Sequence, residues 1–206
     1  MTSNDAASLD RDKIKNVIRA YLKLYRYLHE WRIQKLLFYA DVHSLNSRGT
    51  RLTRAPFKRY TYGVYSRAIA TALSEMSDLK RSPDVAPDGR ETVKYSLPEG
   101  DKVSGISDEE WRIITEAHEA TRAMTTQDIA DWGKQTDLWR NSSFGDLLDF
   151  DRYAKEIVRD RPERVKKLMG TRARSLSSKA RYSTPEEMLS ELEFGTKPSS
   201  RAQKGR

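Results

Sequence analysis

Apolar side chains recur every three or four positions along the first part of the chain, which is the spacing of one face of an α-helix. The first such stripe consists of Ile14, Val17, Ile18, Tyr21, Leu22, Tyr25 and Leu28. A second stripe consists of Ile33, Leu36, Leu37 and Ala40. Asn46 and Gly49 follow it, and both residue types suit a helix end. The pattern predicts two packed helices joined near residues 29–31.

The next segment changes to an extended pattern. RLTRAPFKRYTYG, residues 51–63, is rich in Thr and Tyr and contains a Pro that a central strand would not tolerate. We therefore expect an edge strand or an extended loop, which Gly63 allows to turn into a third helix. The apolar positions of that helix are Tyr65, Ile69, Leu73 and Met76. Farther along, Asp88-Gly89 lies between two extended arms and predicts a hairpin.

Capping residues mark the helices of the second half. Ser107 to Glu110 reads S-x-x-E, a capping box, and apolar positions follow it in helical register. Thr125 or Thr126 suits the start of a fifth helix. Two further helices are expected near residues 153–158 and 162–170.

These elements predict a predominantly α fold with a small β hairpin and edge strands, an α+β class. We expect one compact helical domain over residues 10–170. From Thr171 the composition changes to Ser and basic residues with little to bury, which is typical of a linker. Residues 171–206 are therefore expected to form a flexible basic tail, with a short helix near residues 185–194 that stops at Gly195.

Length and composition agree with a single core. The chain has 206 residues, of which 37% are hydrophobic and 33% are charged. One domain of about 150 residues with extra segments is expected. No apolar run approaches the roughly 20 residues that cross a bilayer, so we expect a soluble, cytoplasmic protein without membrane contact. The absence of Cys excludes disulfides, a thiolate nucleophile and a thiolate zinc site.

The net charge of +8 is concentrated at one end of the chain. Residues 159–206 hold thirteen Lys and Arg against six Asp and Glu, an excess that leaves about +1 for everything before them. Such a tail either condenses on nucleic-acid phosphates without reading sequence, or is a solvated extension without a ligand. Its candidate phosphate contacts are Arg172, Arg174, Lys179 and Arg181.

The sequence contains none of the common catalytic motifs. It has no G-x-x-x-x-G-K-[ST] phosphate loop, no G-x-G-x-x-G, no H-E-x-x-H and no G-x-S-x-G. Asp41 and His43 are two positions apart on a predicted helix, so their side chains point about 200° apart and are poorly placed to share a metal ion. Carboxylate pairs such as Asp108 and Glu109 stand at helix starts, where they favour the helix dipole. We expect a protein that is not an enzyme, with no catalytic residue, metal site or cofactor.

Aromatic side chains offer a different kind of site, because they can hold another protein. Tyr21 and Tyr25 lie on the first apolar stripe and are expected in the core. Tyr27, Tyr60 and Tyr62 fall outside the helical stripes. For these three, core packing and an interface with another protein are both open.

One combination of segments resembles a known family. The helix RIQKLLFYAD, residues 32–41, is followed by PFKRYTYGVYS, residues 56–66, and later by TDLW, residues 136–139. Together they resemble the Panacea domain of SocA-like antitoxins, whose pattern is a K-L-Q-K-L-L-Y-Y-A helix, an aromatic-x-x-G-P-V segment and a closing signature of threonine, histidine and tryptophan. The resemblance covers most of the expected domain, from Ile14 to Trp139.

This resemblance implies a mostly helical domain with a few short strands that neutralises a cognate toxin, encoded nearby, by binding it. Some members are implied to hand the toxin to a protease, so a protease or chaperone is a further expected partner. The chain departs from the family pattern at two positions. Val64 stands where the family has proline, and Asp137 stands where it has histidine.

Partner binding is expected on the second helix and on the turn that follows it. Gln34 and Lys35 flank buried positions of the helix and are expected to form an exposed polar edge. The full set of candidate partner-binding residues is Gln34, Lys35, Tyr39, Tyr60, Tyr62, Gly63, Tyr65 and Trp139. The alternative function is a nucleic-acid-binding regulator, transcriptional or phage-associated, because a hairpin between helices suits a wing and the tail is basic.

Overall fold

A computed structural model of the chain describes residues 3–85, 89 and 91–157. In chain order its elements are α1 (Ser3–Leu24), β1 (Leu28–His29), α2 (Glu30–Arg48), β2 (Lys58–Tyr60), β3 (Gly63–Tyr65), α3 (Arg67–Glu75), β4 (Lys80–Val85), β5 (Glu91–Ser96), α4 (Asp108–Thr121), α5 (Thr126–Gln135) and α6 (Asp137–Arg140). Residues 150–157 are also helical. The fold is mostly helical with small antiparallel sheets, as the sequence predicts. The expected domain boundary at residue 170, the tail with Arg172 to Arg181, and the helix near residues 185–194 lie outside the described residues.

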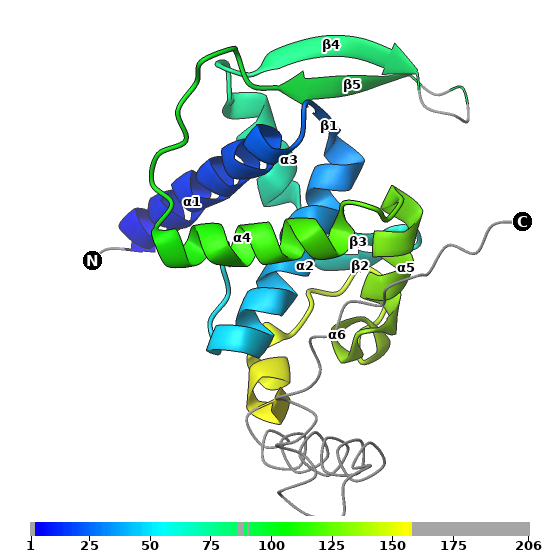
Figure 1. Ribbon diagram of the computed structural model, residues 1–206. Coiled ribbons are helices and arrows are strands. Elements are labelled where there is room, and N and C mark those ends of the chain that lie inside the picture. Colours follow the sequence, from blue (N-terminus) through cyan, green and yellow to red (C-terminus); the bar gives the residue numbers. More distant parts are fainter. Residues whose placement is uncertain (1–2, 86–88, 90, 158–206) are drawn as a thin grey trace, which may run out of the picture. The chain divides into compact units, whose positions relative to one another are not determined.

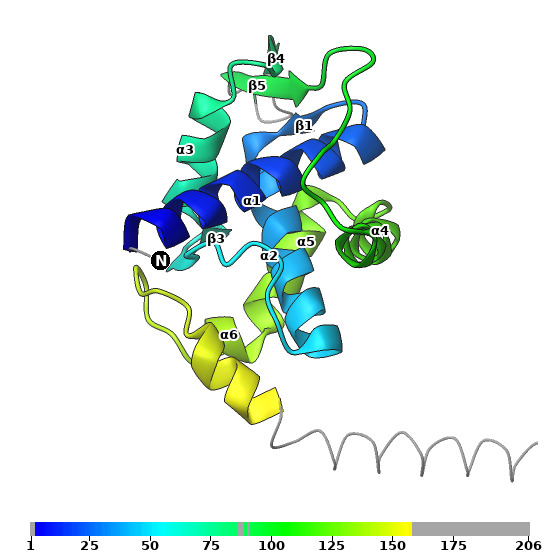
Figure 2. The ribbon, with the colours of Figure 1, turned by 90° about the vertical axis from the view of Figure 1, so that its left-hand side faces the viewer.

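Helix α2 is the centre of the domain. It contacts α1, α3, α4 and α5, and two views at right angles show it surrounded by them (Figures 1 and 2). Ile33, Leu36 and Leu37 are fully buried, as their spacing predicts. Neighbouring helices also cover the side of α2 that lies between the apolar positions. Four of its polar residues are therefore buried together with its apolar ones: Gln34, Lys35, Asp41 and Ser44.

Two small antiparallel sheets cover different parts of this helical core. The first has the strand order β1-β5-β4, and Figure 1 shows the β4–β5 hairpin at the top, beyond the ends of α1 and α3. Arg81 of β4 donates to the Leu73 carbonyl oxygen at the end of α3, at 2.8 Å, which ties the hairpin to the helices. The second sheet pairs β2 with β3, in the register Lys58 with Tyr65.

Local capping signals are confirmed by the geometry. Ser107 and Glu110 form a complete capping box at the start of α4, and Thr125 and Asp128 form another at α5. Helix α2 ends at Gly49, whose φ of 78° is the left-handed conformation that glycine adopts without strain.

Four residues assigned to helices from their spacing lie outside them, among them Tyr25, which follows the last residue of α1. Leu28 belongs to β1, where it pairs with Tyr95, and Tyr65 belongs to β3. Met76 follows α3 as its C-terminal cap. All four fit an apolar stripe although they lie outside the helices. Spacing over a few residues does not distinguish a helical position from a neighbouring segment packed on the same core.

Candidate partner-binding surface

Gln34 of α2 is a buried clamp on the end of β3. Only 1% of the residue is exposed. Its side-chain amide donates to the Ser66 carbonyl oxygen at 3.0 Å, and its Oε1 accepts the Ser66 N–H at 2.9 Å. The expectation of an exposed polar edge at Gln34 is therefore wrong. A backbone N–H and a C=O that leave the sheet need partners inside the protein, and this amide provides both.

Lys35 is buried beside it, with 2% of the residue exposed, so the expected exposed edge is wrong here too. Its Nζ donates to the Val64 carbonyl oxygen at 2.6 Å and lies 5.0 Å from the centre of the Trp31 ring. Burial, and next the charge of Lys134, lowers the pKa of the Lys35 ammonium from its ordinary 10.5 to about 8. The shift means that the charged form is held at a cost in stability.

Gly63 leaves the space that this ammonium needs. Its φ is 103°, a conformation that residues with a side chain rarely adopt. A Cβ at this position would lie 3.1 Å from the Lys35 Nζ. The glycine of the turn therefore serves both the backbone geometry and the approach of Lys35 to β3.

Asp41, almost two turns farther along α2, anchors the loop that leads to β2. It is fully buried, and it accepts from the Thr53 N–H at 2.6 Å and from the Thr53 hydroxyl at 2.9 Å. Arg51 Nη2 donates to the same carboxylate at 2.6 Å. Sequence reasoning considered Asp41 only as a metal ligand, whereas its partners lie ten and twelve residues away on the following loop.

Trp139 is held beside β2 by Thr136 and Arg59. Thr136 caps α6, where its hydroxyl accepts the Trp139 N–H at 3.3 Å. The Arg59 guanidinium lies 4.7 Å from the centre of the Trp139 ring, and only 9% of this tryptophan is exposed. Asp137, which departs from the family pattern, is exposed in the first turn of α6.

The residues shared with the family pattern thus hold β2, β3 and their flanking loops on α2. The profile of the antitoxin SocA-like Panacea domain matches residues 33–140, just over half of the chain. The chain belongs to this family. No curated protein and no solved structure shows significant similarity to it.

Outside these contacts, the Panacea domain exposes a group of large apolar side chains around β2 and β3. They are between 37% and 69% exposed, and we call them the aromatic surface: Trp31, Tyr60, Tyr62, Phe144 and Leu147. The Trp31 and Tyr62 rings meet edge to face with their centres 6.3 Å apart, and Tyr60 and Phe144 do so at 5.6 Å. Three separate segments therefore contribute to one region of the domain.

Backbone pairing explains why these segments meet. The Gly145 N–H donates to the Arg59 carbonyl oxygen at 2.8 Å, and the Arg59 N–H donates to the Asp146 carbonyl oxygen at 3.0 Å. Segment 144–147 consequently runs along the free edge of β2. Since side chains alternate along a strand, Arg59 and Val64 face the core while Tyr60 and Tyr65 face outward.

The structure separates the predicted partner-binding residues into two groups. Tyr60 and Tyr65 come together on the outer side of β2 and β3, with their ring centres 6.0 Å apart, and the exposed Tyr62 lies in the turn between these strands. The remaining predicted residues are not exposed on this outer side. Buried among them are Gln34, Lys35, Gly63 and Trp139, and the Tyr39 ring centre lies 4.3 Å from that of Trp132 on α5.

Three members of the aromatic surface, Trp31, Phe144 and Leu147, were not predicted as partner-binding residues. Trp31 lies in the first turn of α2, off its apolar stripe, which was a usable signal. Phe144 and Leu147 lie in an irregular segment whose pairing with β2 no periodicity predicts.

Other kinds of site find less support. In the part of the chain that the structure describes, no group of three or more His, Cys, Asp and Glu side chains is placed to hold a metal ion. Within the same residues, no helix combines the length and apolar character that a membrane crossing needs. The exposed aromatic surface remains the feature that most needs a functional explanation.

Proposed function

We propose that this domain neutralises a cognate toxin by direct contact through the aromatic surface. The observation that carries the proposal is the exposure of Trp31, Tyr60, Tyr62 and Phe144 together on one hairpin and its neighbours. Tyr and Trp dominate the binding energy of protein interfaces, because each buries a large area and loses few rotamers. Membership of an antitoxin family supports a toxin as the partner.

Buried side chains hold the backbone of the aromatic surface in place, which favours tight binding. Gln34 fixes Ser66 and Lys35 fixes Val64, so the backbone that presents Tyr62 is held by side chains of a buried helix. A surface that is already ordered loses less conformational entropy when a partner binds. We therefore infer that the toxin meets a preformed surface and not a segment that folds on binding.

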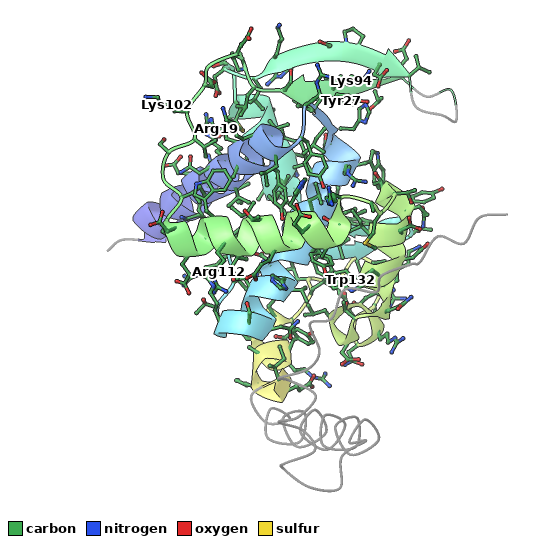
Figure 3. All side chains as sticks on the ribbon, in the orientation of Figure 1. Arg19, Tyr27, Lys94, Lys102, Arg112 and Trp132 are labelled. Atoms are coloured by element: carbon green, nitrogen blue, oxygen red, sulfur yellow. The ribbon has the colours of Figure 1, made fainter. Side chains whose placement is uncertain are left out.

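Co-expression with the product of the neighbouring reading frame tests the proposal. Trp31→Ala and Tyr62→Ala are expected to weaken binding about tenfold or more and to abolish rescue, because they remove central aromatic contacts. Tyr27→Ala is the matched control. Tyr27 is 49% exposed but lies beside Lys94 at the β4–β5 end of the domain (Figure 3).

Both test variants should fold, because nearly half of Trp31 and 69% of Tyr62 are exposed, and Trp31→Ala should lose more stability than Tyr62→Ala because its ring also covers Lys35. Full rescue by Trp31→Ala and Tyr62→Ala would show that the aromatic surface is not the toxin-binding site. An assay of the purified protein with the purified toxin, with and without a protease, distinguishes direct contact from handover to a protease. Inhibition of the toxin without any protease supports direct contact, whereas inhibition only in the presence of a protease supports handover.

A further inference from the structure

We infer that Lys35 is a positioning residue for toxin binding, which acts from behind the aromatic surface by holding Trp31 and the Val64 backbone at the same time. This inference rests on the proposed function. Lys35 itself is buried and cannot touch a partner. Its effect on binding passes through the exposed side chains that it orients.

Two contacts of one ammonium carry the inference. Nζ donates to the Val64 carbonyl oxygen at 2.6 Å and lies 5.0 Å from the Trp31 ring centre. A cation over a tryptophan face is attracted by the ring's quadrupole, and the attraction is stronger when the cation is shielded from water. Trp31 in turn meets the edge of Tyr62 at 6.3 Å. Lys35 therefore links α2, β3 and two exposed rings.

The chemistry of the position argues against simple core filling. A methionine or leucine would fill the same space without the cost of burying a charge. The pKa of Lys35, lowered to about 8, reflects that cost. What the ammonium provides, and an apolar side chain does not, is the pair of contacts to the carbonyl and the ring.

The neighbouring clamp supplies a natural comparison. Gln34 also holds β3, through Ser66, but it has no contact with Trp31 or Tyr62 among the interactions of the described residues. If Lys35 only stabilised the fold, losing either side chain would affect the aromatic surface in the same way. If Lys35 orients Trp31, only its loss will change the environment of that ring.

The test uses full-length protein labelled with 5-fluorotryptophan, in which Trp31→Phe identifies the Trp31 signal among the four tryptophans. In Lys35→Met we expect the Trp31 resonance to move and broaden, while those of Trp111 and Trp139 stay. Affinity for the toxin from the neighbouring reading frame should fall about tenfold, mainly through slower association, because fewer molecules present the binding-competent surface. Gln34→Leu should lower the melting temperature without moving the Trp31 signal.

Each outcome decides between the claims. An unmoved Trp31 resonance and unchanged affinity in Lys35→Met would overturn the inference, while loss of binding in Trp31→Ala would leave the proposed function standing. Normal binding by Trp31→Ala would overturn both. If Lys35→Met does not fold, the Trp31 resonance of the wild-type protein is measured from pH 7 to 9.5 instead. The Trp31 signal should titrate as Lys35 loses its proton, with Lys134 of α5 as the neighbouring charge, and a constant signal overturns the inference.

Discussion

The two hairpins of the domain face solvent with different side chains. The β2–β3 hairpin has strands of three residues, is held from behind by Gln34 and Lys35, and exposes Tyr60 and Tyr62. The β4–β5 hairpin has strands of six residues and is held by its own ladder, by pairing with β1 and by the bond from Arg81 to Leu73.

One face of the β4–β5 hairpin is polar, whereas Val85 and Val93 on the opposite face are 63% and 38% exposed. Asp84 accepts from His29 at 2.8 Å and from Lys94 at 3.1 Å, and Lys94 lies 4.7 Å from the Tyr27 ring centre. Its free edge strand, β4, contains Pro83, a residue that discourages pairing with another chain. The two hairpins therefore differ in what they present: the long one has an edge that Pro83 protects against strand pairing, whereas the short one has exposed aromatic rings on a backbone that buried side chains hold in place.

The largest expected effect comes from placing a methyl group in the turn of each hairpin. Gly63 and Gly89 both have positive φ, 103° and 82°, but only Gly63 would place a Cβ near another side chain, the Lys35 ammonium at 3.1 Å. Gly89→Ala should lose about 1 kcal/mol from backbone strain alone, and Gly63→Ala about 3 kcal/mol. Urea denaturation measures both. Equal losses would show that Lys35 moves aside freely and does not brace the short hairpin.

A pH series should reveal the buried charge behind the short hairpin. The pKa of Lys35 is lowered from 10.5 to about 8, so the folded state releases this proton at lower pH than the unfolded state. Below pH 8 both states hold it. Above pH 8 the unfolded state binds more protons, so stability rises with pH relative to Lys35→Met, by about 2 kcal/mol at pH 9.5.

Denaturation of the wild type and of Lys35→Met at pH 7 and pH 9.5 measures this difference. Ionisation of tyrosines is common to both proteins and cancels. A constant difference between them would mean that Lys35 is not shielded from water.

The long hairpin should respond less to loss of its central carboxylate. Lys94 first and His29 second hold the pKa of Asp84 below its ordinary value, so its contribution is present at neutral pH and is lost as pH falls through that lowered pKa. Asp84→Asn should lower the melting temperature less than Gly89→Ala, since solvent screens the pair. In about 1 M salt the difference should vanish. A salt-independent loss as large as that of Gly63→Ala would end the contrast between the hairpins.

Deletion of residues 171–206 is expected to have the smallest effect on stability. The segment has linker composition, so the melting temperature should stay within a degree or so of the full chain's. Nonspecific retention on DNA at low salt should fall sharply, because the deletion removes eight Lys and Arg against four Asp and Glu, half of the net charge of +8. If retention persists with the same salt dependence, Lys80 and Lys94 of the long hairpin become the candidates, and the hairpin would then act as a wing.

How well the sequence predicted each feature depends on how local the cause is. Ser107 with Glu110 and Thr125 with Asp128 were predictable, because each pair acts across three residues. The family resemblance identified the segments that support the aromatic surface. It did not predict which contacts their polar side chains make.

Gln34 and Lys35 show why the candidate site was harder to predict. A helical pattern treats polar residues between apolar ones as exposed, yet these two are buried because Ser66 and Val64, about thirty residues later, bring backbone groups that need partners. Phe144 joins the surface for a similar reason, since its neighbour Gly145 pairs with Arg59, far earlier in the chain.

The pairing of β1 with β5 has a consequence during synthesis of the protein. Leu28 pairs with Tyr95, so the first sheet cannot close until the ribosome has made the residues between them. At about 5–20 residues per second, that interval lasts roughly 3–13 seconds. Helix α2 is made within this interval, before β5 and the later helices that cover it. A newly made chain therefore passes through a stage in which proteases and chaperones can reach the helix that the finished domain hides most completely.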